Sequence, residues 1–520
     1  MTVDRAHSWR QLWRLQKTMP QAAVLCLLVL IATLAPAQNR ARSGNPVIPG
    51  DHPDPSIIRV GNIYWTASTS GDWSPQFALY RSRDLKHWQP AGAVFPHQPQ
   101  WAGGSFWAPE LVNDDGKILL YYVGRKRGGP LCVAAATAAA PQGPYTDHGP
   151  VVCEPDGSID PAFVRDKNGT PYLIWKEDGN SERKPTPIWA QPLTEDLFHL
   201  TGEKTQLIVN QPESWEGGVV EAPYIMPHAG LYYMFYAGNG CCGTKCNYAE
   251  GVARAKNLLG PWEKNPANPI IGPNEVWRCP GHGTAVETPQ GTDYFLYHAY
   301  PVKGSIYLGR ESVLDKITWG KDGWPLVNNG HGPSGTSAQP AMAVADGFAA
   351  SILDTEWRWP VNHEPTITVG GGTLTLTATA EGNDDFVARS LTAADYTATV
   401  EVTGGEALAS LAVIGNAKHA TGLGKRGDHL ELWHEDGKGH QTLWQQENVQ
   451  AAKVWLKVIS VAGKRLTYSY SLDGRTWTAA GEPLDVTTLP QWDQGLRVGL
   501  TAVGNAGETA AFQRFAMRSK

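Results

Sequence analysis

The stretch DPSIIRVGNIYWTAS, residues 54–68, joins a short apolar strand to an aromatic strand through a glycine turn, and this form returns four times along the chain. Successive copies start 54, 52, 62 and 60 residues apart. A unit of three or four short strands repeated at this period is typical of the blades of a propeller. The repeat therefore predicts a five-bladed β-propeller over residues 45–330. The later copies are APELVNDDGKILLYYVG (108–124), DPAFVRDKNGTPYLIWK (160–176), APYIMPHAGLYYMFYAG (222–238) and HGTAVETPQGTDYFLYHA (282–299).

The rest of the chain is also predicted to be β-structure. Residues 331–345 have little charge and are rich in Gly, Pro and Ser, which is typical of a linker. Beyond them, segments such as YTATVEVTG (396–404) and VWLKVISVAG (454–463) alternate apolar and polar residues, as strands with one buried face do. We expect a β-sandwich of two sheets over residues 346–520. The predicted fold class is therefore all-β.

The N-terminus has the form of a signal peptide. Four basic residues precede an apolar run of about 14 residues, which is shorter than the ~20 that a membrane-spanning helix needs. Ala35-Pro36-Ala37 has the small-x-small form of a cleavage site. We expect residues 1–37 to be removed on export to the periplasm or the cell exterior, with no membrane attachment afterwards.

Charge and cysteines narrow the possible partners. The formal net charge is −6 and the chain has no basic tract, so nucleic acid and anionic membranes are not expected partners. Six of the seven cysteines follow the predicted signal peptide, and an even number in an exported chain favours disulfides. CCGTKC (241–246) and RCPGH (278–282) could instead bind zinc, but their spacing matches no standard zinc site.

Carboxylates gather at the starts of the repeats. The first strand of each propeller blade lines the central axis, so Asp54, Asp160 and Glu221 should converge there, with Glu110 just inside the second copy. A single Asp-Pro is usually a turn former. However, Ala fills the same position in the second and fourth copies, so the turn does not require an acid. Asp51 has no counterpart among the repeat starts and is interpreted as an ordinary loop acid.

Acids crowded in a pocket suit glycoside hydrolysis. Repulsion and burial keep one carboxyl protonated and leave another ionised, which supplies an acid for the leaving oxygen and a base for water. Aromatic rings can stack on the apolar faces of sugars, and the chain has 21 Trp. We expect Trp73 and Trp107 to line the pocket, although both could serve ordinary packing.

Five motifs, in this order, resemble glycoside hydrolase family 43, whose members are five-bladed propellers that act on arabinose- and xylose-containing polysaccharides. The resemblance covers about residues 45–330, and most of the remaining chain resembles the concanavalin-like or jelly-roll-like β-sandwich appended to β-xylosidases of the family. It implies hydrolysis of terminal arabinofuranosyl or xylosyl linkages in plant cell wall oligo- and polysaccharides. The motifs are NPVIPGDHPDPSIIRVGNIYW (45–65), GSIDPAF (157–163), VVEAPYI (219–225), PGHGTAV (280–286) and LGRE (308–311).

The resemblance also implies roles for the acids. Asp54 corresponds to the general base that activates water, and Glu221 to the general acid. Asp160 corresponds to the residue that raises the pKa of the acid and orients it. The family inverts configuration, which implies that the Asp54 and Glu221 carboxyls lie about 6.5–9.5 Å apart.

Two further residues match positions near the substrate in relatives. Arg310 corresponds to an arginine that contacts substrate, or it pairs with a local acid. His282 corresponds to a histidine near an axial ion, often calcium, although calcium prefers several oxygen ligands. No cofactor is expected to be required. A noncatalytic carbohydrate-binding propeller, or a propeller hydrolase acting on arabinan, galactan or fructan, are the alternative interpretations.

Overall fold

The computed structural model describes residues 44–336, 341–379 and 385–520. The predicted signal peptide lies outside these ranges, as do residues 337–340 of the predicted linker. None of the helices within them is both long and apolar enough to cross a bilayer. The prediction of an all-β chain is confirmed, since the described helices are the single turns α2 (Ser305–Leu308), η1 (Asn180–Glu182) and η2 (Asn328–Gly330).

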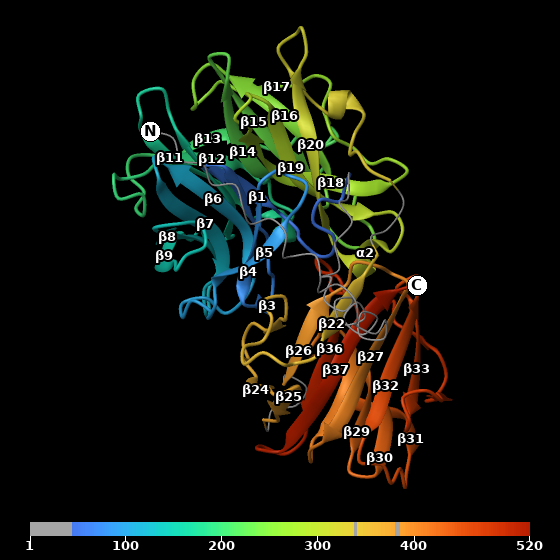
Figure 1. Ribbon diagram of the computed structural model, residues 1–520. Helices are drawn as coiled ribbons and strands as arrows, with labels where there is room; N and C mark the ends of the chain where they lie inside the picture. The colour runs from blue at the N-terminus through green and yellow to red at the C-terminus, as the bar shows by residue number, and fades with distance from the viewer. Residues whose placement is uncertain (1–43, 337–340, 380–384) are drawn as a thin grey trace, which may run out of the picture. The chain divides into compact units, whose positions relative to one another are not determined.

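The first part of the described chain forms five four-stranded antiparallel sheets, each built from strands consecutive in sequence apart from the short β3 (Figure 1). The first is β1 (Ser56–Val60), β2 (Ile63–Ala67), β4 (Gln76–Ser82) and β5 (Gln89–Phe95). The second is β6 (Trp107–Asp114), β7 (Lys117–Arg125), β8 (Leu131–Ala138) and β9 (Thr146–Val152). The third is β10 (Ser158–Arg165), β11 (Pro171–Glu177), β12 (Ile188–Pro192) and β13 (Thr205–Ile208).

The fourth and fifth sheets repeat this pattern. The fourth is β14 (Val220–His228), β15 (Leu231–Gly238), β16 (Ala249–Ala255) and β17 (Glu263–Lys264). The fifth is β18 (Trp277–Glu287), β19 (Asp293–Pro301), β20 (Glu311–Trp319) and β21 (Pro325–Val327). The first strands contact one another in the order β1, β6, β10, β14 and β18, and β18 returns to β1. A closed ring of first strands is the arrangement of a β-propeller, and it brings the repeat starts together.

Apolar residues of neighbouring sheets pack together and fix them face to face. The central strands are almost fully buried, as in β7 with KILLYYVGR and β15 with LYYMFYAG. Such continuous apolar runs are expected where both faces of a strand are covered. Separate clusters lie between adjacent sheets, one of them joining the first and second sheets and another the third and fourth.

The C-terminal part forms two further sheets, which pack on one large apolar cluster as a sandwich (Figure 1). The larger sheet runs β24 (Thr366–Gly370), β25 (Thr373–Thr377), β37 (Thr509–Ser519), β27 (Tyr396–Gly404), β32 (Val454–Val461), β33 (Arg465–Ser471) and β34 (Thr478–Ala479), with β22 (Ala343–Asp346) paired to β37 and β35 (Leu484–Asp485) to β33. The smaller sheet runs β26 (Phe386–Ser390), β36 (Arg497–Val503), β28 (Leu408–Asn416), β29 (His419–Arg426), β30 (His429–Asp436) and β31 (His440–Gln446).

The two parts are joined by backbone pairing and buried polar contacts. The short strand β3 (Trp73–Ser74) pairs with β23 (Trp359–Pro360). Asp51 is buried and accepts hydrogen bonds from the backbone of Arg310, at 3.2 Å, and of Gly495, at 3.1 Å. The interpretation of Asp51 as an ordinary loop acid is therefore wrong: it ties the chain just before β1 to the loop before β36.

Candidate active site

Each of the five sheets has a residue in the left-handed backbone region at its repeat start. A positive φ is uncommon for residues other than glycine, and Asp and His adopt it more readily than most. Bulges in the strand pairing occur beside four of these positions. A bulge redirects side chains, so the same backbone distortion sets the direction of the side chain at each repeat start. The residues and φ values are Asp54 (51°), Ala108 (45°), Asp160 (54°), Ala222 (56°) and His282 (51°).

A polar side chain of the preceding sheet holds the backbone N–H of four of these residues. Each bond joins the distorted residue to a neighbouring sheet, so the inner ends of the sheets fix one another. The bonds are Ala108 N to Thr69 Oγ1 (2.7 Å), Ala222 N to Asp160 Oδ2 (2.9 Å), His282 N to Glu250 Oε2 (2.9 Å) and Asp54 N to His298 Nδ1 (3.1 Å).

Asp54 is a buried carboxylate surrounded by cationic and donor groups. The Arg310 Nη1 lies 2.9 Å from its Oδ1, and Thr69 Oγ1 donates to its Oδ2 at 2.7 Å. The Nδ1 of His282 lies 3.4 Å from Oδ1. Burial alone would raise the pKa of Asp54, but Arg310, His282 and His298 together lower this pKa below its ordinary value. Asp54 is therefore ionised at neutral pH, as a base must be.

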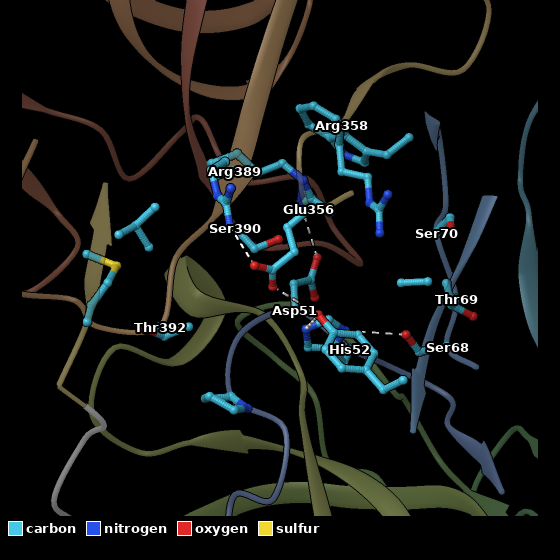
Figure 2. Close-up of a pocket in the computed structure, with 17 residues that line it drawn as sticks. Asp51, His52, Ser68, Thr69, Ser70, Glu356, Arg358, Arg389, Ser390 and Thr392 are labelled. Atoms are coloured by element: carbon cyan, nitrogen blue, oxygen red, sulfur yellow. Dashed lines mark hydrogen bonds and ion pairs between the residues drawn. The ribbon is translucent and has the colours of Figure 1, made fainter. Parts of the chain in front are cut away.

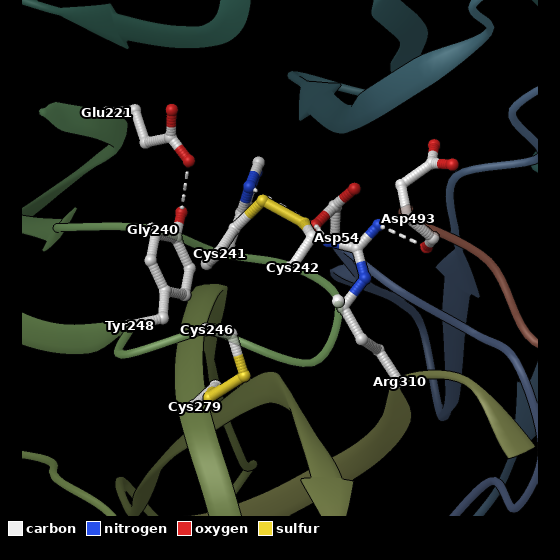
Figure 3. Close-up of a disulfide and its surroundings, with 12 residues drawn as sticks. Asp54, Glu221, Gly240, Cys241, Cys242, Cys246, Tyr248, Cys279, Arg310 and Asp493 are labelled. Atoms are coloured by element: carbon white, nitrogen blue, oxygen red, sulfur yellow. Dashed lines mark hydrogen bonds and ion pairs between the residues drawn. A yellow bond between two sulfur atoms is a disulfide. The ribbon is translucent and has the colours of Figure 1, made fainter. Parts of the chain in front are cut away.

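Glu221 sits one residue before the distorted position of the fourth sheet. Its Oε2 pairs with Lys176 Nζ at 2.8 Å, and Tyr248 donates its hydroxyl to Oε1 at 2.8 Å (Figure 3). Burial raises the pKa of Glu221, but Lys176 and Tyr248 lower it further than burial raises it. The Lys176 side chain is only 1% exposed, so its charge acts on the acid with little screening by water.

Asp160 differs from Asp54 and Glu221 in the direction in which its surroundings shift its pKa. Burial raises the pKa of Asp160 to about 7, and the nearby Glu221 carboxylate pushes it in the same direction. The pKa of Asp160 is thus raised while that of Glu221 is lowered, so of these two carboxyls Asp160 holds a proton more readily. The site combines a carboxyl whose pKa is lowered, that of Asp54, with one whose pKa is raised, that of Asp160.

The loop at residues 491–495 of the C-terminal part reaches this site. Arg310 donates from Nη2 to the backbone carbonyl of Asp493 at 3.2 Å, while its Nη1 holds Asp54. The Trp492 ring is 60% exposed and lies edge-to-face with Trp107, with ring centroids 5.9 Å apart. These two rings, with Asp493, line a pocket of about 250 Å³. This pocket therefore has walls from both parts of the chain, and Asp54, Asp160 and Glu221 are not among its lining residues.

A second pocket, of about 90 Å³, lies where the first sheet meets the C-terminal part (Figure 2). Asp51 and His52 line it from one side and Glu356 and Arg389 from the other, the last two paired at 2.6 Å. Asp54, Asp160 and Glu221 are not among its lining residues. We interpret this pocket as part of the joint between the two parts.

Comparison with known proteins identifies the larger part of the chain. The family model for glycosyl hydrolases family 43 matches residues 43–325. The chain belongs to this family. The model for the β-xylosidase C-terminal concanavalin A-like domain matches residues 345–518. Both matches agree with the resemblances seen in the sequence.

Relatives of family 43 show what the chain is similar to. A xylosidase/arabinosidase of Humicola insolens is 30% identical over 56% of this chain and 56% of its own length. A non-reducing end α-L-arabinofuranosidase of Bacteroides ovatus is 28% identical over 72% of this chain and 74% of its own length. The solved structure of a xylan β-1,4-xylosidase from Bacillus halodurans matches with a TM-score of 0.78 at 23% identity, covering 92% of this chain and all of that one. The chain spans 56–63% of the length of several curated relatives.

The structure of this family 43 protein brings most of the predicted site residues together. Arg310 and His282 both lie beside Asp54, and the ion pair expected as one alternative for Arg310 is formed with Asp54 itself. Trp107 lines the pocket of about 250 Å³ that Trp492 and Asp493 also line. Trp73 lines the same pocket, although its ring is only 3% exposed and packs on Phe386 and Arg497.

Several functional residues were not predicted. Lys176 and His298 lie near the ends of the second strands of their repeats, each opposite the residue before a repeat start, and Thr69 lies at the corresponding place, hydrogen bonded to Pro53. The same place is Val123 in the second sheet and Ala237 in the fourth. These residues could have been recognised in the sequence as polar residues near the end of an apolar strand.

The expectation of a calcium ion near His282 has no donor set to support it. Within the described residues, no group of three or more His, Cys, Asp and Glu side chains is arranged to hold a metal. We therefore assign no step to a metal. The six cysteines that follow the predicted signal peptide are paired as disulfides, which confirms that prediction: Cys132–Cys153, Cys241–Cys242 and Cys246–Cys279.

Proposed function

We propose that this protein is an exported, inverting glycoside hydrolase that removes terminal xylosyl or arabinofuranosyl residues from plant cell wall oligo- and polysaccharides. The catalytic part is a five-bladed propeller over residues 45–330, followed by a linker at 331–345 and a β-sandwich accessory domain at 346–520. Family membership and the names of the relatives, xylosidases and arabinofuranosidases, support this class of substrate.

One observation carries the proposal: three buried carboxyls lie at the repeat starts in different surroundings, Asp54 paired with Arg310, Glu221 paired with Lys176, and Asp160 with its pKa raised by burial. Arg310 holds Asp54 in the charged form, whereas Asp160 holds a proton more readily because its pKa is raised. Binding of a sugar alone would require no such separation of charge states. Hydrolysis requires it, because one group must accept a proton while another donates one.

In the proposed reaction, Asp54 removes a proton from a water molecule as its oxygen attacks the anomeric carbon. The bond from that carbon to the leaving oxygen breaks, and Glu221 gives its proton to that oxygen. Attack from the face opposite the leaving group inverts the configuration. Asp160 positions Glu221 by binding the N–H of Ala222, the next residue, at 2.9 Å, and supplies the proton reserve of the pair.

Glu221 must carry the proton when the substrate is bound. Its ion pair with Lys176 opposes this in the free site, since a neighbouring cation favours the charged carboxylate. We propose that the bound sugar weakens this ion pair and excludes water, which moves a proton from Asp160 to Glu221. Lys176 then stabilises the carboxylate that Glu221 becomes when it has given its proton to the leaving oxygen.

Pocket walls and cysteine pairing support the rest of the proposal. Trp107 and Trp492 offer apolar rings, suited to the C–H faces of a pentose, in a pocket that they share with Asp493, whose carbonyl accepts a hydrogen bond from Arg310. Three disulfides fit an oxidising compartment, in line with the signal peptide proposed for residues 1–37.

A product profile tests the function. The purified protein is incubated with 4-nitrophenyl β-D-xylopyranoside, 4-nitrophenyl α-L-arabinofuranoside, arabinoxylan and arabinan, and the first-formed sugar anomer is read by proton NMR. We expect release of monosaccharide with inverted configuration. Binding of these sugars without any release would overturn the proposal in favour of a noncatalytic carbohydrate-binding protein.

A further inference from the structure

The loop between β15 and β16, residues 239–248, contains two disulfides. Cys246 is joined to Cys279 of β18, which ties the loop to the neighbouring sheet. Cys241 and Cys242 are joined to each other although they are adjacent in sequence. Both are half-buried, so part of their surface faces solvent.

The Cys241–Cys242 bond adds little to the cohesion of the chain. A disulfide stabilises a fold mainly by closing a loop in the unfolded chain, and the effect grows with loop length. Neighbouring residues enclose no such loop. The segment is already fixed by Cys246–Cys279, by Gly243 N donating to Tyr300 at 3.2 Å, and by Arg278 Nη2 donating to the Thr244 carbonyl at 2.9 Å. The Cys241–Cys242 disulfide therefore requires an explanation other than cross-linking of the chain.

The loop is placed directly at the catalytic residues. It begins one residue after β15, whose Ala237 pairs with Glu221, and it ends at Tyr248, which donates to the Glu221 carboxylate. Figure 3 shows the two sulfur atoms between the Glu221–Tyr248 pair and the Asp54–Arg310 pair. A side-chain atom added to Gly243 would meet the Trp492 carbonyl at 3.1 Å, so the loop also adjoins the wall provided by the C-terminal part.

The chemistry of the pair suits contact with a sugar. Oxidised adjacent cysteines form a closed ring with the peptide bond between them, and their side chains then have no free rotor and no O–H or N–H donor. Sulfur is soft and polarizable, and it packs well against apolar surfaces. Such a ring offers a rigid apolar surface at a low entropy cost, like the aromatic rings that usually meet the C–H faces of sugars.

We propose that the Cys241–Cys242 ring is a specificity-determining platform that contacts the C–H face of the pentose held between Asp54 and Glu221. This inference rests on the proposed function, since it assigns a surface of the same site. The disulfide itself carries no O–H or N–H donor, so the platform favours a sugar that presents C–H groups there and disfavours one that presents a hydroxyl.

The test compares pentose binding with and without the ring. In C241A/C242A, the inhibition constants of D-xylose and L-arabinose, the KM of the preferred aryl pentoside and the dissociation constant of the sugar by calorimetry should rise about tenfold, which is about 1.4 kcal/mol. The effect on KM should exceed that on kcat. The matched control is C132A/C153A, which removes the disulfide of the second sheet and should leave sugar affinity within about twofold of wild type.

Peptide mapping by mass spectrometry first establishes that Cys241 and Cys242 are oxidised in the active protein. Free thiols there in fully active protein, or unchanged sugar affinity in a folded C241A/C242A variant, would overturn the inference. If that variant does not fold, wild type is titrated before and after brief phosphine reduction, with loss of the 241–242 bond followed by mass. Retained affinity after its loss would be equally decisive against the platform. Turnover by wild type is measured separately. Absence of turnover would contradict the proposed function, whereas unchanged sugar affinity in the variant would contradict only the platform.

Discussion

Lys176 Nζ lies 2.8 Å from Glu221 Oε2, and this ion pair joins the second strand of the third sheet to the first strand of the fourth. The lysine is almost fully buried and also contacts Asp178, at 2.8 Å, and Asn180, at 2.7 Å. A buried cation beside a carboxyl pair sets the pH at which that pair loses its proton. We therefore expect this ion pair to affect the pH above which the activity falls.

Replacing Lys176 with methionine should shift the pH profile. The lysine lowers the pKa of both Glu221 and Asp160, so its removal raises the pKa of the pair. Because the acid must be protonated, kcat/KM in wild type should fall as the pH rises through about 7. In Lys176→Met this fall should move up by about one pH unit, measured on an aryl pentoside.

The control for this shift is Lys184→Met. Lys184 is half-exposed and pairs with Asp156 and Glu182 rather than with the site acids. Its profile should match wild type, which separates the local effect of Lys176 from a change in net charge. A fall in kcat/KM that stays at the same pH in Lys176→Met, or moves to lower pH, would contradict the role given to the ion pair.

Glu221→Gln should show whether this residue protonates the oxygen of the leaving group. A good leaving group needs little protonation, so 4-nitrophenyl pentosides should lose about tenfold in kcat/KM, while xylobiose or an arabino-oligosaccharide should lose about a thousandfold. The comparison is made at one pH with the folded variant. Equal losses on both classes of substrate would show that Glu221 is not the acid.

Glu110→Gln should change stability rather than chemistry. Burial raises the pKa of Glu110 to about 8, and its main hydrogen bond comes from Ser56 at 3.2 Å. The folded protein binds this proton more tightly than the unfolded chain, so the contribution of Glu110 to stability falls as the pH rises from about 4.5 to about 8. The neutral variant escapes this loss: its Tm should equal wild type at pH 4.5 and exceed it by a few degrees, ~1–3 °C, at pH 9.

A Glu110→Gln variant with the same Tm difference at both pH values would show that Glu110 does not titrate in this range. Asp115→Asn is a suitable comparison, because Asp115 lies in the exposed turn after β6. Its Tm should differ from wild type by a similar small amount at either pH.

The repeat explains why much of the site could be predicted from sequence. Asp54 and Asp160 occupy a position that alanine fills elsewhere, and the structure shows that this position has a left-handed backbone in all five sheets. The change from alanine to aspartate among the repeats therefore marked a position that has an unusual backbone conformation and that we propose to be functional. Glu221 was found in the same way, one residue earlier in its repeat.

The partners of these acids depend on the pairing of strands. Thr69, Lys176 and His298 contact Asp54 or Glu221 only because the second strand of each repeat lies beside the first with a particular register. Trp492 and Asp493 come from a loop more than 430 residues after Asp54 in sequence, and no local pattern marks them. Trp73 has two roles that the sequence alone does not separate, since it packs on Phe386 of the C-terminal part and also lines the pocket with Trp107.

The substitution Asp54→Asn tests the central claim most directly. Asparagine keeps the shape of Asp54 and can still accept a hydrogen bond from Thr69, but it cannot take a proton from water. We expect kcat on aryl pentosides to fall by at least about a thousandfold, with an unchanged circular dichroism spectrum. A folded Asp54→Asn protein that hydrolyses these substrates at the wild-type rate would contradict the account.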